Sequence, residues 1–296
     1  MVRVVLYGLF LLFASLGVGC ALVHIPLTAE HAAMVGPTRV HASIPQEEVT
    51  AVVEKSYVGM MAGGGMLLAL VDAAVESNRA SAANKLIEPI RRDVSDFDFR
   101  AQFYAALEKT LRGIATIKLA KFEPTVKPLS DKDRAALRKQ IPEQAFLSVA
   151  TRYELTSDFQ ALWVITEASL WLRDEEDAVY LAKYHYYTPP IAPAKDSEAA
   201  AAAWAANRGA ALRAALTEGI AETMKMFRLD LRAAPQPVGA LTEEPKVSPG
   251  PIPAGAAPSS LTYLAKEKQR SIVRYGDVLY SVSAEEVFVP AQSSSP

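Results

Sequence analysis

Three consecutive segments in which apolar and polar residues alternate constrain the fold of this chain most strongly. They cover residues 146–155, 160–173 and 178–187. Such alternation is typical of a β-strand that buries one of its faces. Short polar stretches at 156–158 and 174–177 join the three segments and suit tight turns. The sequence therefore predicts a three-stranded antiparallel meander.

Helices are predicted on both sides of this meander in the chain. An apolar stripe that recurs every four residues predicts a helix that Gly113 ends, and residues 197–227 predict a long helix with a break at Gly209. The stripe of the first helix consists of Phe99, Phe103, Leu107 and Leu111. The remaining predicted elements are strands at 38–44 and 115–122 and helices at 46–56 and from Ser130 to about Pro142. The expected fold class is α/β in the α+β sense, with helices packed on a mixed sheet over residues 37–230.

The C-terminal region divides into a linker and a hairpin. Residues 231–260 contain seven prolines with Gly, Ala and Ser, a composition that predicts a Pro-rich linker. Within residues 261–296, Gly276-Asp277 joins two short alternating segments and predicts a β-hairpin, followed by a disordered end. Because two strands alone are marginally stable in water, the hairpin either docks on the main domain or orders on a partner.

The N-terminus reads as a secretory signal that ends at a cysteine. Arg3 precedes an apolar run from Val4 to Gly19, and Cys20, the only cysteine of the chain, follows directly. This arrangement resembles the signal sequences of Gram-negative envelope lipoproteins, in which the residues before the cysteine are removed and the cysteine is acylated. Leu16 stands one place before the leucine position of that motif. A single cysteine also excludes an internal disulfide framework.

The resemblance implies a cleaved signal peptide at 1–19, lipid attachment at Cys20 and a lipid-anchored tether over 20–36. The residue after the cysteine is Ala21 rather than aspartate, which in these lipoproteins implies the outer membrane, facing the periplasm. Two alternatives stay open. Residues 4–23 are just long enough for an uncleaved inner-membrane anchor, or they form a plain signal that leaves a protein without an anchor.

An uncharged, glycine-rich stretch runs from residue 57 to residue 71. It reads either as a glycine loop before a buried helix or as a segment, extending to residue 75, that contacts the membrane or another subunit. The candidate contact residues are Gly59, Gly63, Gly64, Gly65, Met66 and Leu67. A phosphate-binding loop is excluded because Lys and Ser or Thr do not follow the glycines.

No catalytic or metal-binding motif emerges from the sequence. The four histidines have no helical zinc spacing, Gly-x-Ser-x-Gly does not occur, and His185 reads as a surface or sheet histidine. With 31 basic and 33 acidic residues, the chain is not expected to bind nucleic acid by bulk charge. The aromatic residues of the meander form either core or a binding face: Trp163, Trp171, Tyr180, Tyr184 and Tyr186.

These observations favour a non-enzymatic envelope lipoprotein that needs no cofactor or metal. We expect it to bind the membrane through its lipid and to bind or scaffold another envelope protein. The first alternative is an oligomeric membrane-associated or secretion-channel subunit that uses residues 57–75. The second is a periplasmic glycan or cell-wall hydrolase, whose paired carboxylates would be recognisable only in space.

Overall fold

The computed structural model describes residues 24–52, 66–191, 196–232, 261–267 and 269–283. Only the backbone is described for residues 66–78, 261 and 263.

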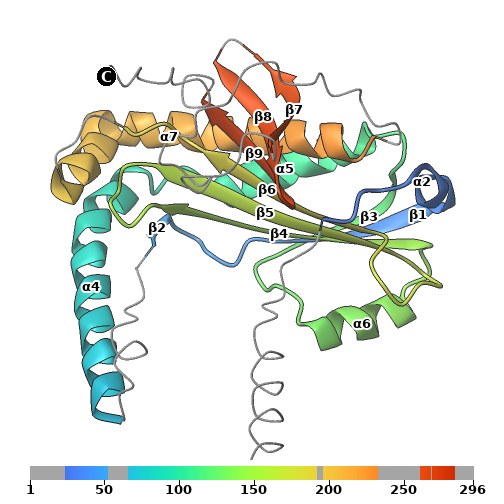
Figure 1. Cartoon of the computed structure of the whole chain (residues 1–296), viewed down its shortest axis with the longest axis horizontal. Helices are drawn as coiled ribbons and strands as arrows, with labels where there is room; N and C mark the ends of the chain where they lie inside the picture. The colour runs from blue at the N-terminus through green and yellow to red at the C-terminus, as the bar shows by residue number, and fades with distance from the viewer. Residues whose placement is uncertain (1–23, 53–65, 192–195, 233–260, 268, 284–296) are drawn as a thin grey trace, which may run out of the picture.

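The described chain forms helices packed on one mixed nine-stranded sheet (Figure 1). The strands are β1 (Pro37–Ser43), β2 (Thr50–Ala51), β3 (Lys118–Thr125), β4 (Ala145–Leu155), β5 (Leu162–Leu172), β6 (Tyr180–Tyr187), β7 (Leu261–Lys266), β8 (Arg270–Tyr275) and β9 (Val278–Ser283). Their spatial order is β3-β1-β4-β5-β6-β9-β8-β7, and β2 pairs with β4. Strands β4, β5 and β6 form the predicted antiparallel meander. The expected fold class is therefore confirmed.

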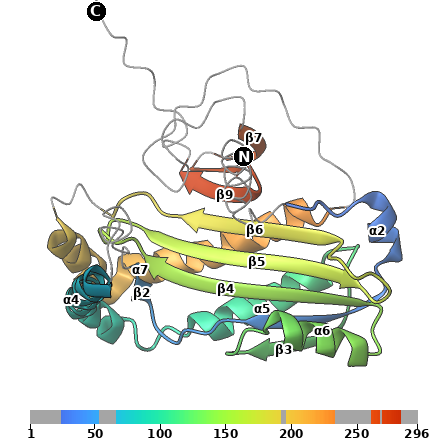
Figure 2. The same ribbon diagram turned by 60° about the horizontal axis from the view of Figure 1, so that its bottom comes forward.

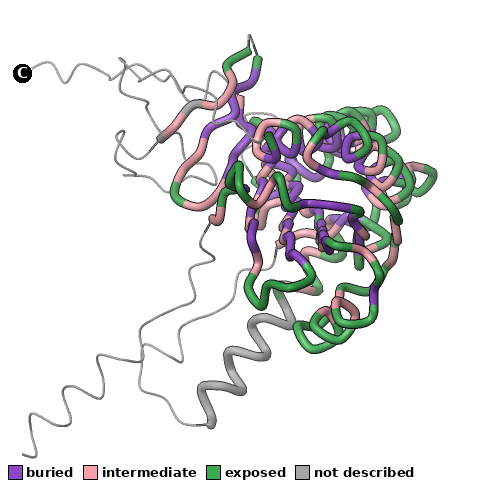
Figure 3. Tube along the Cα trace, turned by 90° about the vertical axis from the view of Figure 1, so that its right-hand side faces the viewer, coloured by how far each residue is buried: buried purple, intermediate pink, exposed green. Residues whose placement is uncertain are grey.

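The helices divide unequally between the two faces of the sheet. They are α2 (Ala29–Met34), α4 (Met66–Asp93), α5 (Phe99–Arg112), α6 (Asp131–Gln140) and α7 (Ser197–Asp230). Helices α5 and α7 cover one face, and α6 covers one end of the other (Figure 2). Buried residues concentrate between the sheet and the α5–α7 layer (Figure 3).

The face opposite α7 is called the open face below. It carries the odd-numbered side chains of β5 and β6 and those of β9 that pair beside them, because side chains alternate along a strand. The residues of its central part are Trp163, Ile165, Glu167, Ser169, Lys183, His185, Tyr187 and Tyr280. At one end of this face, Trp171 and Phe146 pack with α6.

The helix boundaries follow the local signals in the sequence. The Asp98 side chain accepts a hydrogen bond from the Ala101 N–H at the start of α5, and Gly113 caps its end. The Ser130 side chain caps α6 in the same way. The break predicted in α7 is confirmed at residues 206–209, where Gly209 has a φ of +66°.

The helix predicted at 46–56 is wrong where the structure describes it. Thr50 and Ala51 form β2, which pairs in parallel with Glu154 and Leu155 at the end of β4. Val49, directly before β2, is buried in the core. Pairing with β4 and burial of Val49 thus override the local preference for a helix that the sequence of this segment indicates. Residues 53–56 lie outside the described residues.

The tether predicted for residues 20–36 is corrected for its described part, residues 24–36. Ile25 forms a bridge with Leu181 on β6, and Leu27 and Val35 are buried. The Thr28 side chain caps α2. Apolar residues in this segment therefore pack on the body of the protein. Residues 20–23 lie outside the described residues.

The C-terminal hairpin docks on the main domain. Strand β9 pairs in parallel with β6 over Lys183–Tyr186, so β7, β8 and β9 extend the same sheet. Without this pairing β6 would present an unpaired edge of the meander, which favours association with other strands. The boundary predicted between 37–230 and 261–296 therefore does not separate two structural units. The predicted disordered end, from residue 284, lies outside the described residues.

At Gly219, α7 packs closely against the sheet. A Cβ atom added there would lie 2.8 Å from Val164 Cγ2 and 3.0 Å from Tyr186 Cδ1. We expect Gly219→Ala to lower the free energy of unfolding by about 1 to 2 kcal/mol, because overpacking outweighs the gain in helix propensity. Urea unfolding measures this change. The control is Gly113→Ala, whose Cβ would lie no closer than 3.4 Å to its nearest neighbours, Thr110 O and Lys109 O. Equal stability of the two variants would show that Val164 and Tyr186 have room for an additional methyl group at position 219.

Candidate functional site

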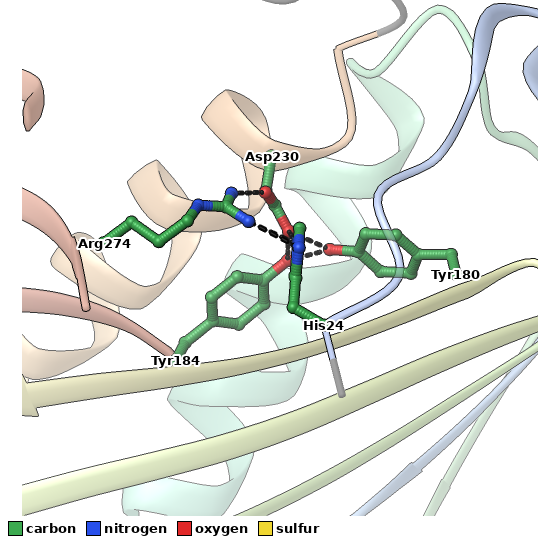
Figure 4. A network of polar contacts seen from close by, with 5 residues as sticks. All are labelled: His24, Tyr180, Tyr184, Asp230 and Arg274. Carbon is green, nitrogen blue, oxygen red and sulfur yellow. Dashed lines mark hydrogen bonds and ion pairs between the residues drawn. The ribbon is translucent and has the colours of Figure 1, made fainter. Parts of the chain in front are cut away.

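The densest group of buried polar side chains surrounds Asp230, the last residue of α7 (Figure 4). We call it the Asp230 cluster; its members are His24, Tyr180, Tyr184, Asp230 and Arg274. The side chains of Asp230 and His24 are only 4% and 7% exposed. Since His24 precedes β1, the tyrosines lie on β6, Asp230 ends α7 and Arg274 lies on β8, the cluster joins four separate parts of the chain.

The Asp230 carboxylate receives hydrogen bonds from every other member of the cluster. Arg274 Nη2 donates to Oδ1 at 2.6 Å, and Tyr180 Oη donates to Oδ2 at 2.7 Å. Tyr184 Oη and His24 Nε2 each lie 3.3 Å from Oδ2. The hydroxyl groups of the two tyrosines also contact each other. Both carboxylate oxygens thus accept hydrogen bonds from protein donors, one at Oδ1 and three at Oδ2.

The charge states of the cluster follow from this geometry. Burial raises the pKa of a carboxyl group, but the hydrogen bond from His24 and the charge of Arg274 outweigh it, so the pKa of Asp230 lies below its ordinary value. Burial, followed by the charge of Asp230, raises the pKa of Tyr180 and of Tyr184 well above the ordinary value. The carboxylate is therefore ionised, and both tyrosines keep the protons that they donate.

One tautomer of His24 satisfies both of its charged neighbours. Arg274 Nη1 lies within hydrogen-bonding distance of both ring nitrogens, and His24 Nε2 lies near Asp230 Oδ2. Because a guanidinium only donates and a carboxylate only accepts, Nδ1 is suited to accept from Arg274 and Nε2 to donate to Asp230. The N-terminal segment is thereby hydrogen-bonded to both α7 and β8.

A second arginine of the hairpin is buried beside α7. Arg270 Nη2 donates to the carbonyl oxygens of Tyr187 at 2.7 Å and Ser281 at 2.8 Å. Its guanidinium carbon lies 4.4 Å from the ring centroid of Tyr186, and Nη1 lies 3.6 Å from Glu218 Oε1. Arg270 and Arg274 therefore hold the hairpin to β6 and α7 at two points.

His185 lies on the open face, enclosed by aromatic rings. Its ring centroid lies 6.4 Å from that of Trp163, in a stacked arrangement, and 5.1 Å from that of Tyr280. Burial, and then the charges of Lys183 and Arg152, lower the pKa of His185 to about 3. The residue is therefore a neutral histidine within the sheet, as predicted.

The predicted aromatic group of the meander is divided between the two faces of the sheet. Tyr180, Tyr184 and Tyr186 are fully buried on the face that α7 covers. Trp163 and Trp171 lie on the open face. Alternation along the strands causes this division, so these five residues do not form one surface.

The residues predicted as sites lie mostly beyond the described part of the chain. Cys20, Gly59, Gly63, Gly64 and Gly65 fall outside it. Met66 and Leu67 open α4, where only the backbone is described.

Sequence analysis did not single out the Asp230 cluster. His24 and Arg274 are 250 positions apart, and no motif connects them. Within the described residues, no group of three or more His, Cys, Asp or Glu side chains is placed to hold a metal ion. None of the described helices is both long enough and apolar enough to cross a membrane.

Comparisons with known proteins give little further guidance. No protein-family model matches the chain, and no curated protein matches it. Among solved structures, the chain is similar to the hypothetical protein CT253 from Chlamydia trachomatis, with 10% sequence identity and a TM-score of 0.25. The similarity covers 67% of this chain and all of the other. A TM-score this low supports no inference about function.

Replacement of the central carboxylate tests the cluster. We expect Asp230→Asn to lower the free energy of unfolding by about 2 to 4 kcal/mol, because it leaves the half-buried charge of Arg274 without its partner. Urea unfolding at pH 7 measures the loss, and hydrogen exchange should show faster exchange in β8 and β9. The matched control is Asp177→Asn in the exposed β5–β6 turn. A loss no larger than that of the control would contradict the role given to Asp230.

His185 makes the stability of the protein depend on pH. The unfolded imidazole binds a proton near pH 6.5, whereas the folded one does so only near pH 3. The free energy of unfolding is therefore unaffected by protonation of His185 above pH 6.5. It decreases as the pH falls from 6.5 towards 3, because only the unfolded chain binds the proton there. Between pH 7.5 and 5 we expect the wild type to lose about 2 kcal/mol more than His185→Phe. Urea unfolding across this range measures it, with Tyr187→Phe on the same face as control. Parallel profiles for wild type and His185→Phe would refute the effect.

Proposed function

We propose that the protein is a lipid-anchored component of the cell envelope that binds or scaffolds another envelope protein from the periplasmic face of the outer membrane. The observation that carries this proposal is the position of His24. This residue follows Cys20 by four positions and is held by Asp230 and Arg274 within the folded body. Acylation at Cys20 would therefore hold the whole sheet close to the membrane rather than on a long tether.

The chemistry of the buried polar groups supports a structural role for them. The Asp230 carboxylate is only 4% exposed and accepts hydrogen bonds from Arg274, His24 and the two tyrosines. His185 is neutral and lies between aromatic rings. Groups held in this way stabilise the fold and are poorly suited to proton transfer with a substrate.

The outer side of β3 is the surface that we assign to the partner. Within the described chain β3 pairs only with β1, so it forms an edge of the sheet. An open groove of about 470 Å³ runs along its start, and Arg112 and Lys118 lie among the lining residues. An unpaired strand edge accepts an extended peptide through backbone hydrogen bonds. Arg112 pairs with Glu108 on α5, so its charge is partly compensated, and Lys118 adds a second positive charge. Together they favour an extended segment that carries acidic residues.

Charged residues on β3 also limit indiscriminate pairing. Lys118 and Lys121 lie at the edge, and Pro124 lacks the N–H group that a ladder requires. The structure places Lys121 against Glu123, so part of the positive charge is compensated. A partner strand with acidic side chains near the start of β3 would gain binding affinity from electrostatic attraction. A neutral strand would not.

Two linked measurements test the proposal. Expression with radioactive palmitate should label the wild type, and Cys20→Ala should carry no label. A photo-crosslinking amino acid at the exposed Ala120 on β3 should then capture one specific envelope protein, whereas the same group at the exposed Ala105 on α5 should not. Absence of the label removes the lipid anchor from the proposal. A labelled protein without a specific crosslink from Ala120 removes the partner site.

A second candidate function is an oligomeric membrane-associated or secretion-channel subunit that uses residues 57–75. The observation that favours it is the length of α4, which has 28 residues and extends beyond the sheet (Figure 1). Contact between copies through this segment would raise the number of chains in each oligomer. Contact with lipid alone would leave that number unchanged, so the two possibilities are distinguishable.

A further inference from the structure

The N-terminal half of α4 extends away from the body of the protein. Helix α4 packs on the core through its C-terminal half, where Ile87 and Ile90 are buried and Ala83 and Leu86 are partly buried. Figure 1 shows the other half extending past the sheet on the side where α6 lies. In Figure 2, which turns that side forward, α4 points towards the viewer. The helix therefore projects on the side of the open face.

The described N-terminal segment begins at the edge of β6, between the two faces of the sheet. Ile25 forms a bridge with Leu181 on β6, and the His24 side chain reaches Asp230 at the end of α7. His24 also lines a small pocket of about 40 Å³ with Glu167, Ser169 and Lys183, whose side chains belong to the open face. Four residue steps separate His24 from Cys20, and an extended chain covers at most about 14 Å over that distance. A lipid on Cys20 would therefore hold the bilayer surface within about 14 Å of this edge.

The length of α4 matches this separation. At a rise of 1.5 Å per residue, Met66 lies about 25 Å along the helix axis from Ala83, where packing on the core begins. This reach exceeds the distance that residues 21–23 allow between the body and the bilayer. The first turns of α4 would accordingly arrive at a membrane that holds the Cys20 lipid.

The sequence at this end of α4 suits the lipid surface. The first six residues of α4, residues 66–71, carry no charge, and Asp72 is the first charged residue of the helix. Six residues are too few to span a bilayer, but an apolar helix start can lie in the boundary between headgroups and acyl chains. The sequence of the first six residues of α4 is Met-Leu-Leu-Ala-Leu-Val.

Electrostatic attraction would contribute little to membrane binding on this side, because the open face carries both positive and negative side chains. Helix α6 has two basic residues in its last turn, but the neighbouring turn at 174–177 consists of four acidic residues. Lys183 is paired with Glu167 at 2.9 Å. Attraction to anionic lipids is therefore weak on this side, and apolar insertion remains as the driving force.

We infer that the N-terminal turns of α4 contact the same lipid bilayer that anchors Cys20, so that the open face of the sheet faces the membrane. This inference rests on the proposed lipid anchor. The membrane then holds the protein at two points, the acyl chains at Cys20 and the apolar start of α4. The α5–α7 layer faces away from the bilayer.

The test uses the full-length acylated protein in vesicles of neutral phosphatidylcholine. Acylation blocks Cys20, so a cysteine introduced by Leu67→Cys is the only free thiol and takes an environment-sensitive fluorophore. The matched control is Ala221→Cys, an exposed alanine on α7. Lipids that carry a quencher near the headgroup should quench the label at residue 67 at least threefold more strongly than the label at residue 221. The difference should persist in 1 M salt, because it depends on apolar contact.

The outcomes separate this inference from the proposed function. Equal quenching at both positions, with the protein still acylated and vesicle-bound, would overturn the membrane contact of α4 and leave the lipid anchor intact. Crosslinking between copies through residue 67 without lipid quenching would also overturn it and would support the oligomeric candidate. A chain without fatty acid would remove the anchor and the orientation together. If Leu67→Cys fails to fold, Ala73→Cys in the same half of α4 provides the second position.

Discussion

The hydrogen bonds to the Asp230 carboxylate hold together parts of the protein that are far apart in the chain. His24 comes from the segment before β1, the tyrosines come from β6, and Arg274 comes from the C-terminal hairpin. Neither the N-terminal segment nor the hairpin has enough apolar surface to form a core alone, so each depends on contacts with the body. The carboxylate at the end of α7 supplies one such contact to both.

A buried charge of this kind contributes to specificity as well as to stability. Removing an ion from water costs several kcal/mol, and the attraction to Arg274 recovers that cost only when the remaining hydrogen bonds are also made. The tyrosine hydroxyls and His24 complete the set around Asp230. A hairpin docked in another register would leave the carboxylate with too few donors. The cluster therefore selects the observed pairing of β9 with β6 over its alternatives.

The position of the cluster also bears on how the protein is oriented. It fixes the first described residue, His24, at the edge of β6, next to both α7 and side chains of the open face. The projecting half of α4 lies on the side of the open face (Figure 2). The face covered by α5 and α7 and the β3 edge are then left for other contacts. With the proposed lipid anchor, this arrangement would hold the open face at the membrane and present a sheet edge to the proposed partner.

The sequence alone determined the elements whose local signals agree with their environment. Alternation over 146–187 predicted the meander, the stripe from Phe99 to Leu111 predicted α5, and Gly209 predicted the break in α7. These patterns are local because each element buries one face, which repeats every two residues or every turn. Local signals failed at β2, where pairing with β4 overrides the helix-start residues before it.

Only the tertiary structure decided where the segments on either side of the domain lie and what Asp230 does. His24 and Arg274 are 250 positions apart and meet at one carboxylate, and a polar residue at the end of a helix gives no sign of such partners in the sequence. The hairpin was recognisable, but its neighbour was not, because backbone pairing with β6 requires only a free edge and a compatible face. The sequence determines periodic burial within each element, whereas long-range pairing depends on which edges and charges remain unsatisfied after the elements assemble.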